Sequence, residues 1–145
     1  MKSRLYGIVQ TALLAAFALV ELLDPSPRTI GGGPVLGFVG EIVALAGVVL
    51  IVVAINTMGK GVRVFAAPRE GAGLVTRGVY ARLRHPIYVG IAVVIFGFAL
   101  RGMTPLAAVV GAVALAFLWL KARYEEQLLA ARYPEYEAYR KSTLF

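Results

Sequence analysis

His85, the only histidine of the chain, stands where a run of cationic and aromatic residues meets an apolar segment. The run reads Gly78-Val79-Tyr80-Ala81-Arg82-Leu83-Arg84-His85-Pro86-Ile87-Tyr88-Val89-Gly90. Because proline suits the first turn of a helix, we expect a helix to begin at Pro86 with His85 near its cap. Backbone N–H groups and the helix dipole favour an anion there, and Arg82 and Arg84 add positive charge. The pattern predicts a site for a carboxylate or a phosphate; the alternative is a histidine that only caps the helix.

A second polar cluster, Glu125-Glu126, follows the last apolar stretch of the chain. Carboxylates accept hydrogen bonds from hydroxyl and amino groups, so an inward glutamate can hold a ribose or an ammonium group. Adjacent positions on a helix do not point the same way. We therefore expect one glutamate to face the site and the other to face solvent, where Lys121, Arg123 or Arg132 would pair with it. Together the two clusters predict a site for a charged, water-soluble cofactor.

The elements that must bring these clusters together are membrane helices. The chain of 145 residues is 59% hydrophobic and only 16% charged, with a mean hydropathy of +0.77, which is outside the range of ordinary soluble domains. Its apolar stretches cover residues 5–23, 35–58, 87–100 and 105–120. A spanning helix needs about 20 residues, so the last two stretches must include their polar ends.

We therefore predict an all-α, polytopic membrane protein with a single membrane-embedded domain over residues 1–145. It has about four transmembrane helices, near 5–23, 35–58, 86–101 and 104–121. For the last two stretches a re-entrant hairpin is the alternative. For the first, Lys2, Arg4 and Ala16-Phe17-Ala18 would also suit a cleavable signal peptide, which we disfavour because hydrophobicity continues to Leu23.

The last two apolar segments are joined by only a short turn, so we expect a tight antiparallel hairpin whose ends at His85 and Lys121 lie side by side. Small residues at helical spacing let helices approach closely in lipid. Those predicted to pack in this hairpin are Gly90, Gly97, Ala108, Ala112 and Ala116.

Beyond Lys121 the pattern predicts a cytosolic amphipathic helix over residues 122–140. Pro134 ends or kinks it. Tyr136 and Tyr139 lie on one face, as interfacial anchors or as part of a lid over the site.

The net charge of +7 is distributed unevenly, which predicts orientation because cytosolic segments carry an excess of Lys and Arg. Only Arg28 and Arg101 fall on the non-cytosolic side. The cytosolic cations are Lys2, Arg4, Lys60, Arg63, Arg69, Arg77, Arg82, Arg84, Lys121, Arg123, Arg132, Arg140 and Lys141. Both termini are thus expected in the cytosol. For most of these cations, setting topology and contacting anionic lipid is a sufficient role.

Several kinds of chemistry are disfavoured. The chain has no cysteine and one histidine, so thiol chemistry is absent and a metal centre is not expected. No soluble domain exists to present a nucleic-acid-binding element. Gly71-Ala72-Gly73 is only a fragment of a phosphate-binding glycine loop. Glu41 lies inside the second apolar stretch, where an ionisable group indicates function, but a position close to the non-cytosolic interface would also explain it, so it is left unassigned.

The two clusters together resemble the isoprenylcysteine carboxyl methyltransferase and phospholipid methyltransferase group of membrane enzymes. The resemblance rests on Gly78-Val79-Tyr80, Arg84-His85-Pro86-Ile87-Tyr88-Val89-Gly90, Glu125-Glu126, and Tyr133-Pro134-Glu135-Tyr136-Glu137-Ala138-Tyr139. It covers residues 56–145, with Pro134 where many relatives have glycine. It implies a helical membrane enzyme that binds S-adenosylmethionine, while a lipidic acceptor enters from the bilayer.

The resemblance also implies roles for individual residues. The implied cofactor-binding residues are Tyr80, His85, Pro86, Tyr88, Gly90, Glu125, Glu126 and Tyr136. Glu126 is also implied in catalysis, with Arg84 and Arg123 as acceptor-side cations. A carboxylate acceptor needs no base, whereas an amine must first lose a proton to His85 or a glutamate.

Other readings stay open at this point. A membrane reductase of the sterol reductase type would bind NADPH, and a non-catalytic membrane protein would keep the fold alone. The acceptor, O- versus N-methylation, and a monomeric or dimeric state are not decided by the sequence.

Overall fold

The computed structural model describes residues 2–59 and 73–145, so the predictions for Lys60, Arg63, Arg69 and Gly71-Ala72 lie outside the described residues. The helices are α1 (Lys2–Leu23), α2 (Pro34–Met58), the 3-10 helix η2 (Gly78–Ala81), α3 (Pro86–Arg101), α4 (Pro105–Arg132) and α5 (Tyr136–Ser142). Within the described ranges there are two isolated β-bridges and no strand. The predicted all-α class is confirmed.

Three of these helices, α1, α2 and α4, are long and apolar enough to cross a membrane. Prolines occupy the first turn of α2, α3 and α4, where a missing N–H costs nothing. Thr104 caps α4 by accepting a hydrogen bond from the amide of Ala107 at 3.1 Å. With 16 residues, α3 is about 24 Å long, which is shorter than a hydrocarbon core of about 30 Å.

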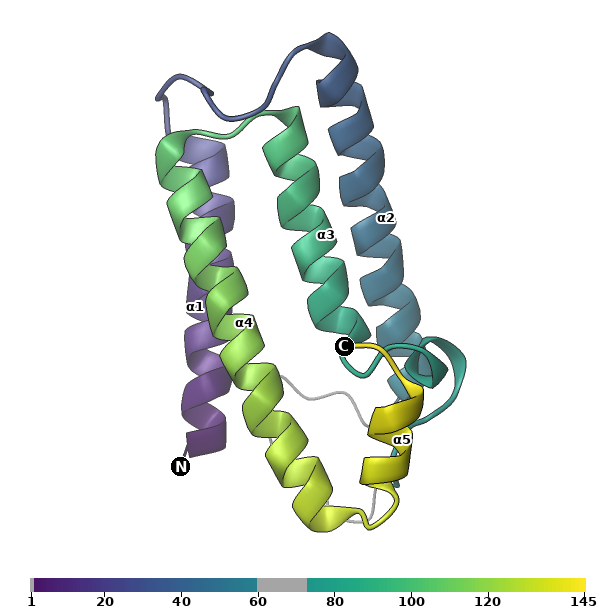
Figure 1. Cartoon of the computed structure of the whole chain (residues 1–145). Helices are drawn as coiled ribbons and strands as arrows, with labels where there is room; N and C mark the ends of the chain where they lie inside the picture. The colour runs from purple at the N-terminus through teal and green to yellow at the C-terminus, as the bar shows by residue number, and fades with distance from the viewer. Residues whose placement is uncertain (1, 60–72) are drawn as a thin grey trace.

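The long helices pack as two pairs, α1 with α4 and α2 with α3 (Figure 1). The expected tight hairpin of α3 and α4 is therefore wrong, although a short turn does join them. Glycines explain the pairing of α3 with α2. A Cβ added to Gly97 would lie 2.5 Å from the Ala44 nitrogen and 2.6 Å from the Gly40 oxygen, and one added to Gly47 would lie 2.7 Å from the Gly90 oxygen. The backbones of α2 and α3 thus touch directly.

The small residues of α4 that are buried against other helices are not the ones predicted. Ala112 and Ala116 are exposed, and Ala108 is half-buried beside the core. The buried row faces α1 and α3, and Gly111 leaves room for the ring of Phe17. Its members are Ala107, Gly111, Ala114, Leu118 and Ala122. Helical spacing alone did not distinguish the two rows, because both repeat every three or four residues.

The predicted separate helix over residues 122–140 is also corrected. No helix-breaking residue stands near Lys121, so α4 runs on without interruption to Arg132. Tyr133 adopts an extended backbone conformation, as expected for the residue before a proline, and Pro134 ends the helix. The chain then turns and forms α5, which packs back toward α4 (Figure 1).

The opposite end of the bundle is closed by polar contacts between the two connecting loops. Ile30 and Met103 exchange backbone hydrogen bonds of 3.2 and 2.8 Å. Arg28 donates to the Glu21 carboxylate at 2.7 Å and to the Gly102 carbonyl at 2.6 Å. Glu41 lies at this end, 3.7 Å from Arg101 and largely exposed, so its position in an apolar stretch needs no catalytic explanation.

Candidate functional site

The imidazole of His85 lies between the two glutamates of α4. His85 caps α3 and is 7% exposed. Its Nδ1 is 3.7 Å from Glu125 Oε2, and its Nε2 is 3.5 Å from Glu126 Oε1. The expectation that one glutamate faces solvent is wrong, because the start of α3, the C-terminal residues and α5 together cover a wide sector of α4. Two neighbouring positions, about 100° apart on the helix, are both enclosed.

Glu125 is held from three directions. The Tyr88 hydroxyl donates to Glu125 Oε1 at 2.8 Å, and Lys121 Nζ lies 3.7 Å from the same oxygen. The rings of Tyr88 and His85 are parallel, with centroids 5.4 Å apart. The carboxylate therefore bridges an aromatic pair on α3 and a cation on its own helix.

Glu126 is paired mainly with Arg84. The Arg84 Nε donates to Glu126 Oε1 at 2.8 Å, and its guanidinium also donates to the carbonyls of Arg140 and Thr143. Arg123 lies 4.0 Å from Glu126, is mostly exposed and stacks over the Trp119 ring. Of the two predicted acceptor-side cations, Arg84 is thus engaged inside the protein, and only Arg123 faces outward.

Two buried tyrosines complete the cluster. Tyr80 on η2 and Tyr136 at the start of α5 are 5% and 1% exposed. Burial raises the pKa of both hydroxyls, so they stay neutral. Within the described residues, the buried side-chain atoms without a hydrogen bond are Glu21 Oε1 and Asp24 Oδ2 at the opposite end of the bundle, and Tyr80 Oη, Tyr136 Oη and His85 Nε2 in this cluster. Of the three in this cluster, His85 Nε2 has Glu126 Oε1 at 3.5 Å. Buried polar atoms are rarely left without a hydrogen bond, so the two tyrosine hydroxyls are candidate ligand contacts.

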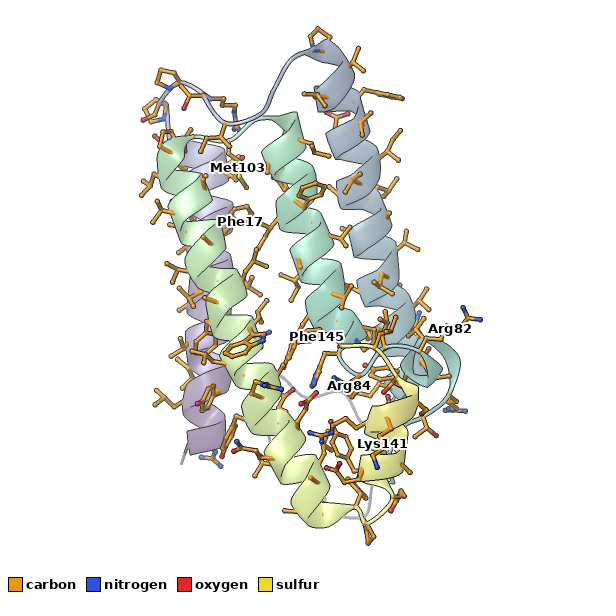
Figure 2. All side chains as sticks on the ribbon, in the orientation of Figure 1. Phe17, Arg82, Arg84, Met103, Lys141 and Phe145 are labelled. Carbon is orange, nitrogen blue, oxygen red and sulfur yellow. The ribbon has the colours of Figure 1, made fainter. Side chains whose placement is uncertain are left out.

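The C-terminal residues lie against the start of α3, as Figure 2 shows for Arg84 and Phe145. The Leu144 amide donates to the Arg82 carbonyl at 2.8 Å, and the Arg84 amide donates to the Leu144 and Phe145 backbone oxygens at 3.0 and 3.1 Å. The Phe145 ring is 5.6 Å from His85. The backbone position predicted for an anion is therefore occupied by the chain itself.

Gly90 does not join this cluster, although the motif placed it with the cofactor-binding residues. It faces α2, where an added Cβ would lie 2.6 Å from Ile51 Cγ1. Pro86 is fully buried at the first turn of α3, next to His85. The motif thus combines residues of the site with a glycine, Gly90, that lets α3 pack closely against α2.

Sequence reasoning missed several contributors. Tyr139 donates to the Tyr80 carbonyl at 2.6 Å and ties α5 to η2, a role that its spacing from Tyr136 hinted at. Lys121 was expected to pair with a solvent-facing glutamate; it does lie 3.7 Å from Glu125 but is buried. No signal in the sequence indicated Gln10 or residues 143–145.

The part of the chain that resembles known proteins includes the residues of this cluster. A family model described as phospholipid methyltransferase matches residues 35–136, from α2 to the start of α5. The cobalt-zinc-cadmium resistance protein CzcN of Cupriavidus metallidurans is 35% identical over 95 residues, which are 63% of this chain and 43% of that protein. The chain thus matches less than half the length of this relative. No solved structure matches the chain.

Proposed function

The chain belongs to the phospholipid methyltransferase family, and we propose that it transfers a methyl group from S-adenosylmethionine to a lipidic or amphiphilic acceptor at the cytosolic face of the membrane. Its helices identify it as a membrane protein. The observation that supports the proposal best is the cluster in which His85 lies between Glu125 and Glu126, together with the buried hydroxyls of Tyr80 and Tyr136 that have no hydrogen bond among the described residues.

The residues fit the chemical groups of the proposed cofactor. S-adenosylmethionine carries an ammonium, a carboxylate and ribose hydroxyls, and carboxylates accept from the first and the last of these. Glu125 and Glu126 provide the acceptors, and the neutral hydroxyls of Tyr80 and Tyr136 add donors. When bound, the cofactor supplies a methyl group on a sulfonium, which an acceptor oxygen or nitrogen attacks as the carbon–sulfur bond breaks.

The contribution of the protein to such a transfer is mainly alignment, since a well-oriented pair of reactants gains a large effective concentration. Glu126 is fixed by Arg84, and Glu125 is fixed by Tyr88, so both carboxylates have defined orientations. A carboxylate acceptor would need nothing more. For an amine acceptor, His85 or a glutamate beside it would take the proton, since the imidazole lies 3.7 Å from Glu125 and 3.5 Å from Glu126 within the same cluster.

The relative named for resistance to cobalt, zinc and cadmium does not extend this proposal to metals. In the parts of the chain that the structure describes, no group of three His, Cys, Asp or Glu side chains is arranged so that it could hold a metal ion. We therefore carry over the chemistry of the family alone.

The test is a calorimetric titration of the detergent-solubilised full chain with S-adenosylmethionine and S-adenosylhomocysteine. Saturable binding that His85→Ala abolishes is expected, whereas Glu41→Gln, a substitution at an exposed carboxylate at the other end of the bundle, should leave it unchanged. Absence of binding to folded wild-type protein would refute the proposal. Binding of NADPH instead of S-adenosylmethionine would support the hypothesis of a membrane reductase.

A further inference from the structure

Lys121 is a lysine enclosed in the protein at the apolar part of α4. It is 1% exposed, although lysine is almost never fully buried unless it is paired. Its Nζ donates to Oε1 of Gln10 on α1. Gln10 precedes the region matched by the family model, so this contact joins a helix outside that region to the site.

The other neighbours of the ammonium belong to the proposed cofactor site. Lys121 Nζ lies 3.7 Å from Glu125 Oε1, one turn further along α4, and 5.4 Å from the centre of the Tyr88 ring on α3. Tyr88 donates to the same glutamate oxygen, and His85 approaches the other. Among the described residues, the charged and titratable groups near Lys121 include Glu125, Tyr88 and, through Glu125, His85.

We propose that Lys121, held by Gln10 of α1, is a positioning residue that fixes the Glu125 carboxylate against Tyr88 and His85. The inference rests on the proposed function, because it assigns Lys121 a part in shaping that cofactor site. A buried carboxylate needs a compensating cation, and Lys121 Nζ lies 3.7 Å from Glu125 Oε1. The amide of Gln10 keeps the ammonium from moving away. By this contact α1 becomes part of the site.

The direct test replaces Lys121 with methionine, which keeps most of the volume and removes the charge. Lys121→Met should weaken S-adenosylhomocysteine binding about tenfold, the effect of losing one charge-assisted contact. Gln10→Leu should weaken it less. Phe17→Leu is the control, since it alters the same α1–α4 interface away from the site. This control should lower the melting temperature and leave the affinity unchanged.

An exchange variant separates positioning from general support of the fold. In Gln10→Lys with Lys121→Gln, the ammonium and the amide still pair but the charge leaves α4, so the melting temperature should return toward that of wild type while affinity stays about tenfold lower. A folded Lys121→Met protein that binds as wild type does would overturn the inference. So would affinity losses that merely follow melting temperature in Lys121→Met and Phe17→Leu alike. If Lys121→Met does not fold, Gln10→Leu and the exchange variant decide.

One readout does not depend on cofactor binding. Because His85 is the only histidine, its ring resonances can be identified by NMR without assignment of the rest of the chain. They should move in Lys121→Met and stay in place in Phe17→Leu. Moved resonances together with no cofactor binding by wild type would refute the proposed function and leave the positioning intact; unmoved resonances would refute the positioning.

Discussion

Arg84 and Glu126, 42 residues apart in sequence, form a 2.8 Å ion pair that joins the start of α3 to the last third of α4. The same guanidinium reaches the carbonyls of Arg140 and Thr143. One side chain thus connects three segments around the site. Its planar fork suits this task better than a lysine ammonium would.

Arg84→Lys should keep the charge and lose this geometry. We expect a loss of about 1–3 kcal/mol in stability, the range for unmade charge-assisted hydrogen bonds, together with weaker cofactor binding. Thermal unfolding and calorimetric titration measure the two effects. Arg132→Lys, on an exposed part of α4, is the matched control. Equal behaviour of the two variants would contradict the role of Arg84.

Tyr139→Phe should loosen the attachment of α5 to η2. It removes the hydrogen bond to the Tyr80 carbonyl, which should lower the free energy of unfolding by about 1 kcal/mol. Because Tyr80 and Tyr136 lie on the two elements that this bond joins, cofactor affinity should fall by several-fold. Tyr133→Phe is the comparison, since it changes a tyrosine before the turn rather than after it. Unaltered affinity in Tyr139→Phe would show that α5 is held by other contacts.

Gly97→Ala should separate α2 from α3. The new methyl group would meet backbone atoms of Ala44 and Gly40 at 2.5 and 2.6 Å, and backbone cannot rotate away as a side chain can. A destabilisation of about 1–3 kcal/mol is expected, as for overpacked cores. Gly37→Ala, on α2 with nothing within 4 Å, should be neutral or stabilising because alanine favours a helix. Both are measured by thermal unfolding in the same detergent.

The orientation of the chain can be tested with reporter fusions. The N-terminus and the C-terminal end of α4 lie at the same end of the bundle (Figure 1), which we assign to the cytosol. A reporter that is active only in the cytosol should therefore work when fused after Phe145. The same reporter inserted in the Asp24–Arg28 loop should be silent. The reverse pattern would contradict this orientation, because the site would then face away from cytosolic S-adenosylmethionine.

What could be predicted from the sequence was largely local. Pro86 and Pro105 mark the starts of helices, Pro134 marks the end of α4, and the apolar stretches mark the long helices. The meeting of His85 with one of the two glutamates was also anticipated, but from a tight hairpin of the last two apolar segments that the structure does not show, and the enclosure of both glutamates was not expected.

Long-range pairing was not predictable from these patterns. The glycines of α3 fit either neighbouring helix, and only Gly40 and Gly47 on α2 offered backbone at matching heights. Lys121 was expected beside a solvent-facing glutamate because the pattern along α4 does not show that Gln10 of α1 lies opposite. The C-terminal residues carried no signal, since their hydrogen bonds to residues 82–85 use backbone groups that every residue has.

The direct contact between α2 and α3 also bears on how acceptor preference can change during evolution. These two backbones leave no space for new side chains, so this face is closed to variation. In contrast, α3 meets α4 through side chains such as Ile91 and Leu118, close to Tyr88. Under the proposed function, substitutions there would alter the shape available to the chain of a lipidic acceptor while the polar cluster is preserved. One scaffold can in this way acquire new substrates without rebuilding its chemistry.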